Sequence, residues 1–219
     1  MVTRKKMSDS EALELYRMAL TNSKNQVLLA QILASFGYGP LVIEEGWVLY
    51  ETAQQSYVVN IKEDDETSEA SALFKLKKDE LAEDYSEHRG IAKIVFSNQP
   101  EILKRLQLTG RVPRKYIKWF EMVKKFYTEI QSDEQLIEKL SRFNLNAEAV
   151  AQAISLIEAV EAAKFELYRE EGESQEATVQ KNTDIEIIRN WMNEFFAIAR
   201  IALKDHPQLL EALGLLVRS

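Results

Sequence analysis

The sequence repeats itself once, and this constrains the fold more than any other feature. At an offset of 107 positions the chain matches itself without a gap from Leu33, opposite Leu140, to the last residue. More than a dozen pairs are identical, where ordinary composition gives roughly five by chance. Because insertions into loops cost little free energy, a match without gaps indicates a common origin. The identical pairs include Phe36/Phe143, Pro100/Pro207, Leu103/Leu210 and Leu106/Leu213.

The composition predicts that the repeated element is helical. Only seven glycines and four prolines interrupt 219 residues, too few for an all-β fold with a turn at roughly every ten residues. Ala, Leu, Glu, Lys and Gln are abundant, and these residues favour helix. We therefore expect an all-α fold, a tandem duplication of a unit of about 107 residues with repeat units 1–112 and 113–219. Such units form up-and-down helical bundles with pseudo-twofold symmetry if they pack face to face. The sequence leaves open whether the repeats make separate bundles or one interleaved body.

Hydrophobic periodicity places the elements of the first half. It predicts a helix over 8–36, a break at the sequence GYGP, and a second helix that runs from Pro40 to about Lys62. A third helix follows, and Pro100 opens a short closing helix. The second half repeats this order, with Asn146 as the cap of its second helix.

Two acidic segments separate the second and third expected helices. They read KEDDETSEAS at 62–71 and REEGESQEAT at 169–178. We expect solvated turns there, with Thr67 or Ser68 and Ser174 capping the following helices. Neither segment has the ligand spacing of an EF-hand calcium loop.

Three phrases of the sequence are similar to a known family. They are ALTNSKNQVLLAQILASFGYG, SRFNLNAEAVAQAISLIEAVEAAKFE and RIALKDHPQLLEALGLLVRS. In them the chain resembles a family of uncharacterised bacterial two-repeat all-helical proteins. The resemblance covers nearly the whole chain and implies an all-helical, duplicated fold. It assigns no activity and no site residue.

Charge is distributed unevenly along the chain. The net charge is −7, yet the segment 104–125 has eight basic residues and one acid, Glu121. The segment 44–87 has thirteen acids and four lysines. A chain polarised in this way suits a protein partner or self-association, with a homodimer as the simplest case. The predicted interaction residues are Arg111, Arg114, Lys115 and Lys118.

The basic segment also contains Tyr116, Trp119 and Phe120. Basic residues with aromatic rings suit single-stranded nucleic acid, on which the rings stack. In the competing interpretation, Ile117, Phe120 and Val123 lie on successive helical turns, so the aromatic rings belong to the core. We favour the second interpretation, because an acidic surface repels phosphate.

His88 is the strongest candidate for a metal-binding or acid–base residue. It falls on the apolar stripe of the third expected helix, and Asp84 lies one turn earlier on the same face. A carboxylate that orients an imidazole is typical of metal and acid–base sites. We favour a structural Asp–His pair, because a single histidine makes a poor metal site and the spacing lacks the Glu-x-x-His pairs of di-iron bundles.

Four glutamates recur at matching positions, as Glu51/Glu158 and Glu87/Glu194. Carboxylates that converge between helices could hold a divalent cation or a basic partner. Unpaired buried carboxylates are costly, so surface or rim positions retained by ancestry are the preferred interpretation. No metal or cofactor is predicted, and the weak metal candidates are Asp84, His88, Glu87 and Glu194.

Sequence motifs of catalysis are missing. The chain has no P-loop, no G-x-S-x-G, no H-E-x-x-H and no cysteine. No stretch approaches about 18 uninterrupted apolar residues, and we expect a cytoplasmic protein that does not bind membranes. The preferred function is a non-enzymatic helical scaffold or protein-interaction module. The alternatives are a metal- or small-ligand-binding bundle and a nucleic-acid-binding protein that uses segment 104–125.

Overall fold

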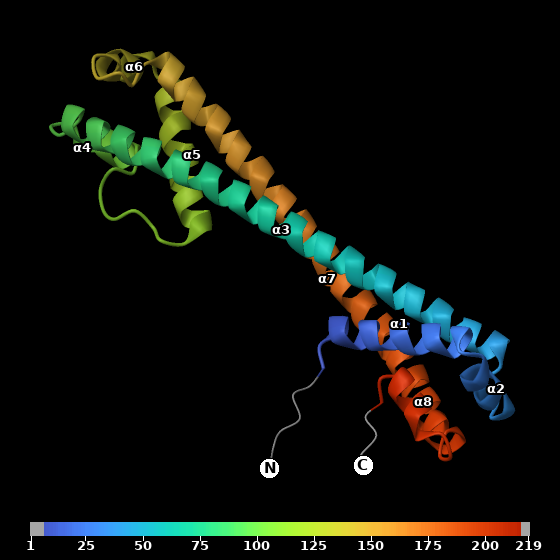
Figure 1. Ribbon diagram of the computed structural model, residues 1–219. Helices are drawn as coiled ribbons and strands as arrows, with labels where there is room; N and C mark the ends of the chain where they lie inside the picture. The colour runs from blue at the N-terminus through green and yellow to red at the C-terminus, as the bar shows by residue number, and fades with distance from the viewer. Residues whose placement is uncertain (1–6, 216–219) are drawn as a thin grey trace, which may run out of the picture. The chain divides into compact units, whose positions relative to one another are not determined.

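The computed structural model describes residues 7–215 and is all-α over that stretch, which confirms the predicted fold class (Figure 1). The residues 216–219, which end the gapless self-match, lie outside it. Eight helices and no strand form in the described chain. The helices are α1 (Asp9–Asn25), α2 (Val27–Ser35), α3 (Pro40–Val95), α4 (Pro100–Arg105), α5 (Tyr116–Gln131), α6 (Glu134–Ser141), α7 (Ala147–Ala202) and α8 (Pro207–Ala212).

Corresponding helices of the two halves begin 107 residues apart. The starting positions are 9 and 116, 27 and 134, 40 and 147, and 100 and 207. The long helices α3 and α7 have 56 residues each, and the short helices α4 and α8 have six. Pro40, Pro100 and Pro207 each open a helix, as predicted, since proline has no N–H to lose in the first turn.

The chain divides into two compact units that do not follow the sequence halves 1–112 and 113–219. Unit 1 takes in the described residues up to Asp65 and from Gly172 onward, and unit 2 is Glu66–Glu171. Unit 1 therefore holds α1, α2, the start of α3, the end of α7 and α8. Unit 2 holds the end of α3, α4, α5, α6 and the start of α7. Each unit combines helices from both halves of the sequence.

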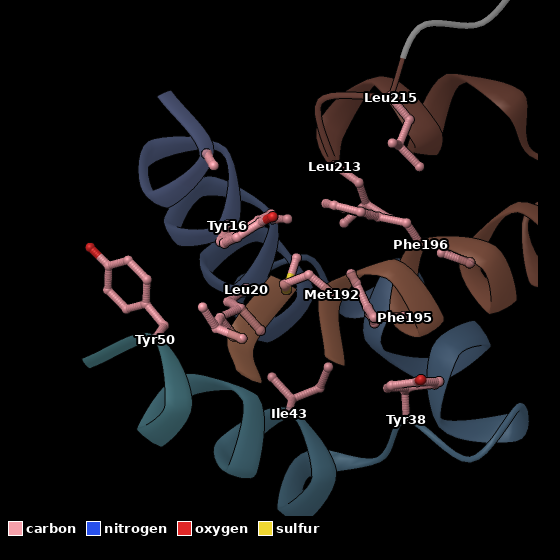
Figure 2. Close-up of a cluster of buried hydrophobic side chains, with 14 of the residues drawn as sticks. Tyr16, Leu20, Tyr38, Ile43, Tyr50, Met192, Phe195, Phe196, Leu213 and Leu215 are labelled. Carbon is pink, nitrogen blue, oxygen red and sulfur yellow. The ribbon is translucent and has the colours of Figure 1, made fainter. Parts of the chain in front are cut away.

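The core of unit 1 is rich in aromatic rings. Figure 2 shows side chains from α1, α3 and α7, and from the residues that follow α8, gathered in one cluster. The ring of Phe195 is fully buried, and it contacts Tyr38 edge-on at 5.1 Å and stacks on Trp191 at 5.5 Å between centroids. Such pairs contribute about 0.5–1.5 kcal/mol beyond their buried area.

The core of unit 2 is built around α5. Phe126, Tyr127 and Ile130 of α5 are fully buried, and Tyr85 of α3 meets Phe126 edge-on at 5.4 Å. Leu106 and Leu108, which follow α4, belong to the same cluster. The corresponding Leu213 and Leu215 of the second half are buried in unit 1.

In unit 1 a segment of α3 packs antiparallel to a segment of α7, and polar pairs fix the register. Asn60 donates to Thr178 at 3.0 Å, and Ser174 donates to Asp64 at 2.6 Å. Ser56 also donates to Asp184. The residue numbers of the partners rise along α3 and fall along α7, so the two helices run in opposite directions. Buried polar groups that need one particular partner penalise a shifted register.

The prediction of turns at 62–71 and 169–178 is wrong, because both segments are helical within α3 and α7. The first contains no glycine or proline, and the second contains only Gly172, so neither carries a strong helix breaker. Their polar side chains also find partners: Thr67 Oγ1 donates to the Glu170 carbonyl at 3.1 Å within unit 2. A loss of apolar periodicity therefore marked a polar helix pair and not a turn.

The predicted single helix over 8–36 is interrupted at Gln26, whose backbone is extended at φ −94° and ψ 107°. The helix that follows, α2, buries Leu29 and Leu33 and leaves Val27 exposed. The break at GYGP is confirmed: Gly37 has φ 93°, in the left-handed region that suits glycine. Asn144, 107 residues later, takes φ 65° in the corresponding turn.

We predict that Gly46→Ala lowers the stability of the protein. A β-carbon at Gly46 would lie 2.4 Å from Cη2 of Trp191, and overpacking of this kind costs about 1–3 kcal/mol. The matched control is Gly90→Ala, also within α3, where an added β-carbon meets nothing within 4 Å. Helix propensity alone favours alanine by about 0.5–1 kcal/mol at both positions, so the control gains stability. Urea denaturation followed by circular dichroism measures both, and a gain at position 46 would contradict the packing argument.

Candidate functional site

A groove of about 740 Å³ lies on unit 2, lined by residues of α3, α7 and the start of α5 with the segment before it. We call it the basic groove. Its lining contains five cations and no acidic side chain. The cations are Lys78, Arg114, Lys115, Lys118 and Lys164, and the other lining residues are Phe74, Tyr116, Ile117, Trp119 and Tyr168.

The aromatic rings of the basic groove are held by other side chains. Phe74 meets Tyr116 edge-on at 5.3 Å, and Tyr116 stacks on Phe120 at 5.5 Å. The Nζ atom of Lys164 lies 4.0 Å from the ring centroid of Tyr168 and 4.8 Å from that of Phe74. Cation–π contacts of this kind contribute about 0.5–2 kcal/mol, so they fix the Lys164 charge in the groove.

The buried side chain of Arg89 shapes the loop that leads to the groove. Its guanidinium donates to the carbonyls of Gln107, Leu108 and Gly110 at 3.3, 3.1 and 3.3 Å. These carbonyls precede the segment that supplies Arg114 to the groove. Arg89 follows Leu81 and Tyr85 on the buried face of α3. An arginine on an otherwise apolar stripe was the sequence signal for this role, and our sequence analysis missed it.

We predict that Arg89→Met lowers the stability of unit 2 by about 2–4 kcal/mol, because hydrogen bonds to a charged group contribute about 1.5–3 kcal/mol each. Methionine keeps the apolar stem and removes the donors. The control is Lys93→Met, an exposed position one turn later on α3. Hydrogen exchange of the amides in 107–115 would report the loosened loop. Equal protection in both variants would show that Arg89 does not hold it.

The structure brings three of the four predicted interaction residues together. Arg114, Lys115 and Lys118 line the basic groove, whereas Arg111 is exposed outside its lining. Sequence reasoning missed Lys78 and Lys164, which lie far from the basic segment in the chain and reach the groove through packing of α3 and α7.

Other charges of the basic segment serve the fold. Arg105 pairs with Glu129 at 2.7 Å and with Asp133 at 2.8 Å. Lys124 pairs with Glu161 at 2.7 Å. The segment therefore contains both cations that connect helices of unit 2 and cations that face the groove.

The aromatic and aliphatic residues of the segment differ in their burial. Trp119 and Phe120 are buried, which confirms the expectation that they belong to the core. The prediction for Ile117 is wrong, because 69% of it is exposed. The helix begins only at Tyr116, so Ile117 lies in its first turn on the outer side and presents an apolar surface beside the lysines.

His88 pairs with a different residue from the one predicted. Asp84 is exposed, and the hydrogen-bond partner of His88 Nδ1 is the hydroxyl of Tyr127, at 2.8 Å. Burial lowers the pKa of His88, and the charges of Asp84 and Glu87 oppose that shift. Burial also raises the pKa of Tyr127. The hydrogen bond joins α3 to α5 within unit 2, and the tautomer of the neutral ring sets which group donates.

The four repeated glutamates do not share one unit. Glu51 and Glu194 belong to unit 1, and Glu87 and Glu158 belong to unit 2. All four are exposed. Glu51 accepts from Trp47 Nε1 at 2.8 Å, and Glu194 accepts from the Tyr38 hydroxyl at 3.3 Å. Burial, with a contribution from Glu194, raises the pKa of Tyr38 to about 12.

The metal candidates do not gather into a ligand set in the described chain. Within residues 7–215, no group of three or more histidine or carboxylate ligand atoms lying within 4.8 Å of one another includes any of the six residues considered. They are Glu51, Asp84, Glu87, His88, Glu158 and Glu194.

We predict that the protein loses stability as the pH falls, in part through His88. Because the pKa of His88 is below its ordinary 6.5, the unfolded chain binds a proton more readily than the folded chain. The contribution of His88 is present above pH 6.5 and is lost as the pH falls through the lowered pKa. His88→Phe should therefore show a smaller loss of unfolding free energy between about pH 7 and pH 5. Parallel curves for the two proteins would contradict this.

Comparison with known proteins found no matching family model, no similar curated protein and no similar solved structure. Among the described residues no single helix has the length and apolar character of a membrane span. The pair α2 and α3, bent by 102° at their junction, passes that test only when the two are taken together.

Proposed function

We propose that this protein is a helical protein-interaction module whose basic groove binds an acidic, amphipathic segment of a partner protein. The observation that carries the proposal is the lining of the groove: five cations, no acid, and apolar rings between them. Like charges gathered around an apolar surface are unfavourable for the isolated molecule, and an anionic partner relieves their repulsion. A volume of about 740 Å³ suits side chains that insert from a docked helix.

The state of the aromatic rings favours a peptide over a nucleic acid. Bases stack on free ring faces, but Lys164 lies over one face of the Tyr168 ring, and Tyr116 already stacks on Phe120. Trp119 is buried. What the groove offers instead is aliphatic surface at Ile117, surrounded by lysines. This combination suits leucine-like side chains flanked by carboxylates.

We also propose that the two halves arose by tandem duplication and that the second copy acquired most of the cations of the groove. The equal spacing of the helix starts supports the duplication. The positions 107 residues before Lys115 and Lys118 hold Ser8 and Glu11, which form the capping box of α1. Four of the five lining cations, all but Lys78 of α3, therefore belong to the second copy, which is the pattern expected when one duplicate takes on most of a binding role.

The proposal predicts that a fluorescent, Glu-rich helical peptide with a leucine stripe binds the protein and that salt weakens the binding. Lys115→Glu/Lys118→Glu should reduce the affinity roughly tenfold or more, since charge reversal turns attraction into repulsion. Fluorescence anisotropy measures the affinity. The matched control is Lys125→Glu, an exposed position of α5 outside the groove lining, which should bind nearly as well as the unchanged protein.

A labelled oligothymidine serves as the second probe in the same assay. Tight binding of the oligonucleotide with no binding of the peptide would replace the proposal with nucleic-acid binding. Equal peptide affinities for the charge-reversed variant and the control would show that the groove is not the binding site.

A further inference from the structure

Unit 1 carries a groove of opposite charge. Its volume is about 650 Å³, and it is formed by α3 together with Trp191 of α7. We call it the acidic groove. Its charged lining residues are Glu44 and Glu45, and no cation lines it. The remainder of the lining is apolar, with Leu41 83% exposed and Val48 54% exposed.

The carboxylates of the acidic groove differ in their local contacts. Glu44 pairs with Lys24 at 2.5 Å, and both side chains are about half exposed. Exposed pairs of this kind contribute about 0–1 kcal/mol, so they are readily exchanged for another cation. Glu45 and Val48 lie one turn apart on the outer face of α3 and are both exposed. Together they present an acidic, amphipathic stretch of helix.

An acidic, amphipathic stretch of helix is the kind of segment that we propose the basic groove binds. The basic groove offers lysines around exposed Ile117, and the acidic groove offers glutamates around exposed aliphatic side chains. Each face lacks the charge that the other presents. Contacts of like with like would set the five cations of one copy against the five of another, or glutamates against glutamates, and such juxtapositions cost several kcal/mol.

We infer that the protein associates with itself, the basic groove of one copy binding the acidic face of α3 in a second copy. This inference rests on the proposed function, because it names the partner of the same groove. The two faces are different surfaces of one chain, so the contact is heterologous. In a pair, one copy keeps its acidic groove free and the other keeps its basic groove free, so association can continue beyond two copies or close into a ring.

The test uses the full chain and two charge-reversed variants. Lys115→Glu/Lys118→Glu replaces two of the five cations of the basic groove with acids, and Glu45→Lys/Val48→Lys places two lysines on the acidic face. All four positions are exposed, and circular dichroism checks that both variants keep their helix content. Light scattering coupled to size exclusion measures the mass over a range of concentrations, at about 0.05 M and about 0.5 M salt.

The unchanged protein should show a mass that rises with concentration and falls toward the monomer at high salt. Each variant alone should associate at least roughly tenfold more weakly, because one of its two faces no longer complements the other. An equimolar mixture should recover association, since each variant presents the face that the other needs. Lys125→Glu should associate like the unchanged protein.

A monomer at every concentration and salt would overturn the inference, and so would two variants that associate as before or a mixture that does not recover. These outcomes are distinguishable from failure of the proposed function. If the Glu-rich peptide still binds the basic groove while the unchanged protein stays monomeric, the groove serves a different partner. If neither the peptide nor a second copy binds, both proposals fail.

Discussion

Antiparallel packing of α3 against α7 is the interaction on which the rest of the structure depends. In unit 1 it runs from the apolar contacts of Ile43 to the polar pair of Asp64 with Ser174. In unit 2 it includes the bond from Thr67 to the Glu170 carbonyl and the contact of Lys164 with Phe74. Because each long helix contributes to both units, neither half of the sequence can complete a core by itself.

The basic groove follows from this arrangement. Its walls come from α3 and α7, and the start of α5 closes it. Arg89 holds the preceding loop through three carbonyls, while Lys164 is fixed over two rings. Buried polar contacts and cation–π contacts therefore hold these cations in place at the surface. These contacts support the proposal that the groove is a binding surface.

Much of the fold could be predicted from the sequence, because local signals are strong where they exist. The helix starts at Pro40, Pro100 and Pro207 and the left-handed turn at Gly37 depend only on residue chemistry nearby. The prediction failed where apolar periodicity faded, at 62–71 and 169–178. A polar helix whose side chains bond to another helix has the same composition as a solvated turn, and only the partner distinguishes them.

The sequence by itself determined that the protein is helical and where most of its helices begin, since propensity, capping and proline geometry act over a few residues. It also determined the basic character of segment 104–125. Only the tertiary structure decided that each compact unit draws on both halves, that His88 pairs with Tyr127, and that Lys78 and Lys164 join the groove. Those outcomes depend on contacts between residues far apart in the chain. Such contacts form when the apolar faces of the helices pack against one another.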